Sequence, residues 1–310
     1  MEASGAGRRG ARRVAALALA AVGLAACSGG GHPPAGSAPA ASPTTAAVPT
    51  TAATAGPATA DPDAGATTTG PRRAERAARL AATLARAERA IRDPATPDRE
   101  LPALGRAQQR AYRTVVRDPA LLARLLPLVP ADLRPVVRAN VAAGIDLRRL
   151  SRPGPGLPPW RIVTPRPASE LLAAYHDAEA ELGVPWTYLA AINVVETRSG
   201  RVRGSSPAGA RGPMQFMPST WRSYGAGGDI DSVHDAILAA ARMLRDNGAP
   251  ADMAALYAYN HSPLYVRAVT AYAERMRADQ RAFLGYHQWQ VYYGDTLLPE
   301  GYPARAPIAG

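Results

Sequence analysis

Apolar residues recur at helical spacing through most of residues 72–280, and this pattern constrains the fold more than any other feature of the chain. Leu84, Ala87 and Ile91 show the spacing, and an Asp-Pro pair at residues 93–94 ends that run. No segment alternates polar and apolar residues over the length of a strand. The sequence therefore predicts an all-α protein with at most a minor sheet.

Similar start and stop signals delimit the other predicted helices. A second helix around residues 104–115 is expected to end at Asp118-Pro119, and two shorter ones are expected around 120–126 and 131–143, the last closed by Gly144. Nothing in these segments carries recognisable chemistry. Further helices are expected from Ser169 to Leu182 with Gly183 as its end, from Trp186 to near Gly200, and after Asp231, Asp252 and Pro263.

The N-terminus resembles an export signal. Four arginines precede an apolar run, Val14 to Ala26, which is too short to span a bilayer. The run ends in Leu-Ala-Ala-Cys, which resembles the lipobox of bacterial lipoproteins, so we expect lipidation at Cys27 and membrane attachment through that lipid anchor. A plain secretory signal with an incidental cysteine is the alternative. Cys27 is the only cysteine, which excludes an intramolecular disulfide.

Composition divides the chain further. The Ala/Pro/Thr-rich segment at residues 27–71 cannot bury enough apolar surface to offset the entropy lost on ordering it. The Pro/Gly-rich segment at residues 151–167 marks the best domain boundary. The expected organisation is a signal peptide (1–26), a disordered spacer (27–71), a helical N-terminal region (72–150), a linker (151–167) and a catalytic domain (168–310).

The formal net charge is +11, and every one of the 36 basic residues counted as Lys or Arg is an arginine. Attraction to an anionic cell wall and the codon bias of a GC-rich genome explain this basicity equally well. Nucleic acid is not an expected partner of an exported lipoprotein. We expect the protein to act as a monomer.

Glu196 is the candidate for acid/base chemistry. It lies on the last turn of a largely apolar helix, on the same face as Leu189, Ile192 and Asn193. Burial and the negative end of the helix dipole should both raise its pKa, as a general acid requires. The alternative is an exposed carboxylate paired with a neighbouring arginine.

The stretch "GARGPMQFMPSTW", residues 209–221, predicts a shaped and partly buried loop. Its two prolines and its glycines oppose a regular helix or a central strand, while its methionines and phenylalanine are too apolar for an ordinary surface loop. Gln215 is the one amide side chain that it carries.

Four separated segments resemble the lytic transglycosylase domain of the lysozyme-like superfamily, over about residues 168–280. That family carries Glu-Ser, Ser-x-x-Gly-Ala, Gly-Leu-Met-Gln-x-Met-Pro and Ala-Tyr-Asn in this order. The matching elements here are Glu196, "SPAGA" from Ser206, "GPMQFMP" from Gly212, and "YAYN" ending at Asn260.

The resemblance implies a helical lysozyme-like fold and cleavage of the β-1,4 bond between N-acetylmuramic acid and N-acetylglucosamine in peptidoglycan. Glu196 would be the catalytic acid and then the base, and the C6 hydroxyl of the muramic residue would attack C1 to give a 1,6-anhydro end. The substrate-binding residues implied are Ser206, Gln215, Met217, Tyr259 and Asn260.

Some positions depart from the family pattern. Thr197 replaces the serine after the glutamate, Pro213 replaces a leucine, and His261-Ser262 replaces Ala-Gly. One extra residue also separates Glu196 from Ser206. These changes affect the subfamily and leave the catalytic assignment intact.

Two other functions stay open. A goose-type lysozyme would use Asp229 or Asp231 as a base that orients water, and a non-catalytic protein would only hold peptidoglycan. No cofactor or metal is expected. The aspartates at 229, 231 and 235 lack the glycine and glutamate of a calcium loop, and the histidines lack zinc-ligand spacing. Aromatic residues that could stack on sugars, though most are expected in the core, are Trp221, Tyr224, Trp289, Tyr292 and Tyr293.

Overall fold

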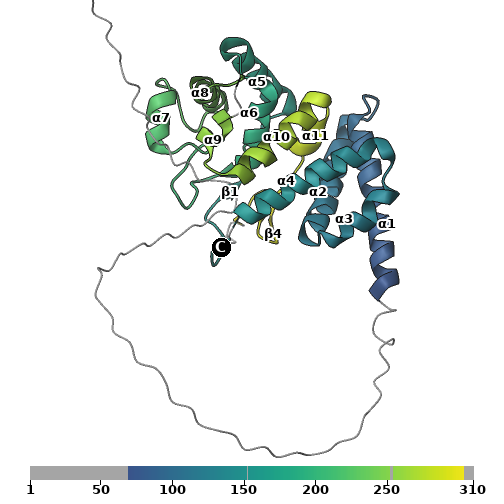
Figure 1. Cartoon of the computed structure of the whole chain (residues 1–310). Coiled ribbons are helices and arrows are strands. Elements are labelled where there is room, and N and C mark those ends of the chain that lie inside the picture. The colour runs from purple at the N-terminus through teal and green to yellow at the C-terminus, as the bar shows by residue number, and fades with distance from the viewer. Residues whose placement is uncertain (1–68, 152, 252–253, 304–310) are drawn as a thin grey trace, which may run out of the picture.

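The computed structural model describes residues 69–151, 153–251 and 254–303, and it confirms an all-α protein with eleven α-helices in these ranges (Figure 1). The predicted signal peptide, the lipidated Cys27, most of the predicted spacer (27–68) and Asp252 lie outside the described residues. The last three residues of the predicted spacer, 69–71, are helical and begin the first helix, so the spacer ends earlier than predicted. None of the helices within these ranges has the length and apolar content needed to cross a bilayer.

Four helices make up the N-terminal region. The predicted stop before Asp93 is confirmed, but the expectation that Gly144 ends a helix is wrong: the helix continues to Leu150. A Cβ atom on Gly144 would lie 2.6 Å from Cγ2 of Val116, so this glycine allows two helices to pack closely. The helices are α1 (Thr69–Arg92), α2 (Leu101–Arg117), α3 (Ala120–Leu125) and α4 (Arg134–Leu150), with single 3-10 turns at Asp98–Glu100, Leu126–Leu128 and Ala131–Leu133.

Seven helices and two small ribbons follow. Gly183 ends α5, as predicted, and it does so in the left-handed conformation. The expectation that Asp231 caps α8 is wrong: Ser232 caps it through its hydroxyl oxygen, which accepts the main-chain N–H of Asp235. The short helices α7 and α11 and the ribbons were not predicted. The helices are α5 (Ala168–Leu182), α6 (Trp186–Thr197), α7 (Pro218–Tyr224), α8 (Val233–Asp246), α9 (Ala254–Tyr259), α10 (Pro263–Ala278) and α11 (Ala282–His287). Antiparallel pairs join β1 (Arg161–Ile162) to β2 (Val202–Arg203), and β3 (Val291–Tyr293) to β4 (Thr296–Leu298).

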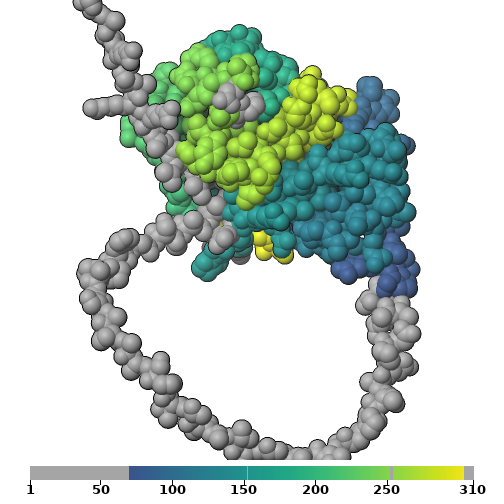
Figure 2. Space-filling model, viewed as in Figure 1, coloured from purple at the N-terminus to yellow at the C-terminus, as the bar shows by residue number. Residues whose placement is uncertain are grey.

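The helices on either side of the Pro/Gly-rich segment share one hydrophobic core. Helix α10 packs along α4, and Figure 2 shows α10 in lime lying against the teal N-terminal helices. Arg267 of α10 forms a bidentate ion pair with Asp146 of α4, at 2.9 and 3.0 Å. The side-chain amide of Gln109 bonds both main-chain groups of Gln290, at 2.8 Å each. These contacts join residues on either side of the predicted linker (151–167), and the division into domains remains a prediction.

Candidate functional site

Glu196 lies on the last turn of α6 and is almost completely buried, with 3% of its surface exposed. The hydroxyl group of Tyr265, on α10, donates a hydrogen bond of 2.8 Å to Oε1. Oε2 is buried and has no hydrogen-bond partner among the described residues. Because native proteins pair nearly all of their buried polar atoms, an unpaired carboxyl oxygen marks a candidate for contact with a ligand.

The carboxyl group is biased toward its protonated form. Burial raises the pKa of Glu196 well above its ordinary value, and this outweighs the hydrogen bond from Tyr265 and the charge of Arg198, which both lower it. Arg198 directs a side-chain N–H to the main-chain oxygen of Val194, at 2.6 Å. The expectation of a buried acid with a raised pKa is therefore confirmed, and the alternative of an exposed, ion-paired carboxylate is not.

Tyr265 is a site residue that the sequence reasoning missed. It is fully buried, and its ring stacks on that of Tyr259 with centroids 6.4 Å apart and an angle of 7° between the planes. The hydroxyl group of Tyr259 in turn donates to the main-chain oxygen of Met214, at 2.6 Å. The two tyrosines thus connect Glu196 with the loop at residues 212–217.

That loop is a tight hairpin. The main-chain groups of Arg211 and Phe216 exchange two hydrogen bonds of 2.8 Å, and Gly212 and Gln215 have positive φ angles of 75° and 52°. A Cβ atom on Gly212 would lie 1.9 Å from the main-chain oxygen of Ile230, so no larger residue fits there. The predicted shaped and partly buried loop is confirmed.

Helix α6 holds the hairpin through the residues on either side of Glu196. The main-chain oxygen of Pro213 accepts hydrogen bonds from the side chains of Asn193, at 2.9 Å, and Thr197, at 2.6 Å. The hydroxyl oxygen of Thr197 also accepts the N–H of Gly200, at 3.0 Å. A serine could make these bonds, which explains why threonine is tolerated at this position.

Of the other predicted binding residues, Gln215 belongs to the hairpin and Met217 directly follows it. The side-chain amide of Gln215 donates to the main-chain oxygen of Gly212 at 3.0 Å, and Met217 is half-buried at the start of α7. Asn260 is buried directly after α9. Ser206 shares no hydrogen bond with these groups within the described residues, since its hydroxyl oxygen accepts the N–H of Ala210 at 3.0 Å and closes a separate turn.

The two aspartates considered as an alternative base have other partners. The carboxylate of Asp231 pairs with Arg211 at 2.9 Å, and that of Asp229 accepts the main-chain N–H of Asp231 at 2.9 Å. Both lie in the segment packed behind Gly212.

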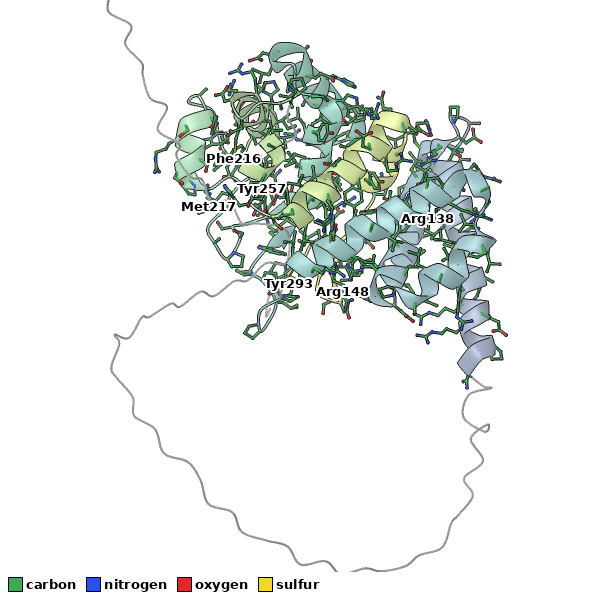
Figure 3. The ribbon with its side chains drawn as sticks, in the orientation of Figure 1. Arg138, Arg148, Phe216, Met217, Tyr257 and Tyr293 are labelled. Carbon is green, nitrogen blue, oxygen red and sulfur yellow. The ribbon has the colours of Figure 1, made fainter. Side chains whose placement is uncertain are left out.

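Tyr257, which was not among the aromatic residues predicted to stack on sugars, has an exposed ring. Tyr257 of α9 is 45% exposed, and its ring meets that of His261 edge-on, with centroids 5.2 Å apart. Figure 3 shows Tyr257, Phe216 and Met217 at the end of the molecule that carries α7 and α9. Trp289, by contrast, is buried and donates to Gln108, as expected of a core residue.

The comparison with protein families agrees with this geometry. The model of the transglycosylase SLT domain matches residues 174–281, which contain α6, the hairpin, α9 and α10. No curated protein and no solved structure matches the chain significantly. Residues 174–281 are therefore a transglycosylase SLT domain of the lysozyme-like superfamily, a domain that cleaves peptidoglycan at the cell wall, outside the cytoplasm.

Proposed function

We propose that this protein is a lytic transglycosylase that cuts the β-1,4 bond between N-acetylmuramic acid and N-acetylglucosamine during cell-wall remodelling, with Glu196 as its single acid/base. The observation that carries the proposal is the buried carboxyl group of Glu196, with one oxygen bonded to Tyr265 and the other unpartnered among the described residues.

The chemistry follows from these two oxygens. Since Tyr265 donates to Oε1, Oε2 is the oxygen that carries the proton and delivers it to the glycosidic oxygen. The resulting carboxylate then accepts the proton of the muramic C6 hydroxyl as that oxygen attacks C1 and closes the 1,6-anhydro ring. An internal nucleophile has a high effective molarity, so one acid/base suffices. Because Oε2 is buried, the neighbouring atoms must move aside to admit the sugar.

The hairpin and its surroundings would bind the glycan. Gln215, Met217 and Asn260 are proposed to line the cleft beside Glu196, with Ser206 at its edge, and Tyr259 supports the hairpin through Met214. The engaged carboxylates of Asp229 and Asp231 argue against hydrolysis by an oriented water.

Product mass tests the reaction. Digestion of purified peptidoglycan should give muropeptides with 1,6-anhydro ends, which weigh one water less than hydrolysed reducing ends. Glu196→Gln should abolish their release while the variant still folds. Hydrolysed ends would indicate a goose-type lysozyme, and glycan binding without any product would indicate a non-catalytic wall protein.

Location forms a separate part of the proposal. Lipidation at Cys27 would hold the enzyme at the membrane, and the spacer (27–68) would let the domain reach the wall. Cys27→Ala should move the protein from the membrane fraction to the soluble fraction of fractionated cells. Retention of the variant in the membrane fraction would remove this part of the proposal.

A further inference from the structure

A surface hollow of about 340 Å³ lies beside the hairpin at residues 211–216. It is lined by Arg161, Val202, Arg203, Gly204, Gly212 and Asp231. Gly212 belongs to the hairpin, and its main-chain oxygen accepts both the main-chain N–H and the side-chain amide of Gln215. Strand β2, which forms another wall, follows α6 and Glu196 along the chain. A ligand held at Gln215 would therefore have the hollow directly next to it.

Two arginines face each other across the ribbon at this hollow. Arg161 of β1 and Arg203 of β2 are direct partners in the antiparallel register. Like charges in this arrangement destabilise a strand pair. The side chain of Arg161 has no hydrogen bond or ion pair within the described ranges, and Arg203 donates only to the main-chain oxygen of Asp231, at 3.2 Å.

The acidic residue of the hollow does not neutralise this pair. The carboxylate of Asp231 is already bonded to Arg211, at 2.9 Å. Of the three arginines, only Arg211 is paired with this carboxylate, and the guanidinium groups of Arg161 and Arg203 have no carboxylate partner among the described residues. A guanidinium group presents a planar fork of N–H donors that matches a carboxylate. In peptidoglycan the carboxylates are carried by the peptides attached to the muramic residues, next to the bond that is cut.

We propose that Arg161 and Arg203 bind a carboxylate of the peptide attached to the glycan, so that the enzyme selects peptide-bearing strands. This inference rests on the proposed function, because the glycan must occupy the site beside Glu196 for its peptide to reach the hollow. It adds a second recognition element, separate from the sugar contacts of the hairpin.

The test compares peptide-bearing glycan with glycan from which the peptides have been removed, where each muramic residue carries the carboxylate of its lactyl group in place of a peptide. Sacculi freed of attached anionic polymers are used directly or after an amidase has removed the peptides. For a variant with both Arg161→Gln and Arg203→Gln, kcat/KM on peptide-bearing sacculi should fall by about tenfold and stay unchanged on peptide-free glycan. The control is Arg138→Gln, an exposed arginine on α4 (Figure 3), which lowers the charge away from the hollow.

Binding gives a second readout that does not depend on turnover. In a Glu196→Gln background, the double variant should sediment less well with peptide-bearing sacculi and equally well with peptide-free glycan. Equal losses on both substrates, a loss only on walls that retain their phosphate polymers, or no loss would each overturn the proposal. An enzyme that cuts neither substrate but still binds peptide-bearing sacculi through these arginines would overturn the proposed function alone.

Discussion

The hydroxyl group of Tyr265 donates a hydrogen bond of 2.8 Å to Oε1 of Glu196, across 69 positions of sequence. This bond favours the ionised carboxylate, while burial favours the protonated acid more strongly. Tyr265 therefore both orients the acid and limits how far its pKa rises.

Tyr265→Phe should consequently change the pH profile as well as the rate. Loss of the hydrogen bond raises the pKa of Glu196 further, so the alkaline limb of the activity profile should move to higher pH. The less well oriented carboxyl group should lower kcat by about tenfold. Tyr286→Phe, which removes a buried hydroxyl that bonds Asn140 instead, is the matched control and should leave the limb in place. A lowered rate with an unmoved alkaline limb would mean that Tyr265 acts only through packing.

The raised pKa of Glu196 also predicts a pH-dependent cost in stability. Between the unfolded pKa of about 4.3 and the higher folded pKa, the unfolded chain releases this proton and the folded protein keeps it. This group alone lowers the free energy of unfolding by about 1.4 kcal/mol per pH unit within that window, and the cost stays constant above the folded pKa.

Glu196→Gln cannot ionise, so near neutral pH its melting temperature should equal or exceed that of the wild type, and the gap should narrow as the pH falls toward 4.3. Thermal melts across pH measure this directly. A clear drop in melting temperature for the variant at neutral pH would show that Glu196 is an ionised structural residue, and the proposed mechanism would lose its acid.

Features that depend on local sequence were predictable. The stop at Asp93-Pro94 and the left-handed Gly183 follow from backbone chemistry within one turn. The burial of Glu196 follows from the apolar residues around it on α6. The error at Gly144 arose from a contact between distant segments. In sequence, a glycine that ends a helix cannot be distinguished from one that lets a neighbouring helix pack closely, and only the position of Val116 in the structure identifies the second role.

Contacts between distant segments were not predictable. Tyr265 belongs to none of the four motif segments, and only the packing of α10 against α6 brings its hydroxyl group to Glu196. The basic hollow likewise needs the pairing of β1 with β2, two strands of two residues each, which are too short to show a period in sequence.

The hydroxyl group of Thr197 should matter more than its methyl group. Thr197→Val removes the acceptor for the buried N–H of Gly200 and one of the two donors to the main-chain oxygen of Pro213, which keeps its hydrogen bond from Asn193. We expect a loss of about 1 to 3 kcal/mol in unfolding free energy and lower activity, because the hairpin is less firmly held. Thr197→Ser keeps both bonds and should retain most of the activity. Chemical denaturation and turnover on sacculi, measured on the same preparations, check both expectations, and a serine variant as impaired as the valine variant would contradict them.

Gly212 should be the position of the hairpin that tolerates substitution least. The reason is a steric clash, which can be measured separately from backbone strain. Its φ of 75° already disfavours any side chain, and an added Cβ atom would meet the main-chain oxygen of Ile230 at 1.9 Å. Gly209 shares the first feature, with a φ of 90°, but has open space around it. Gly209→Ala should therefore cost about 1 to 2 kcal/mol, the strain alone. Gly212→Ala must also push the hairpin away from the segment at residue 230, so it should cost more than about 3 kcal/mol and abolish activity by displacing Pro213 from its hydrogen bonds with Asn193 and Thr197 of α6. Denaturant melts of the two variants measure the difference, and equal costs would show that the contact with Ile230 does not hold the hairpin in place.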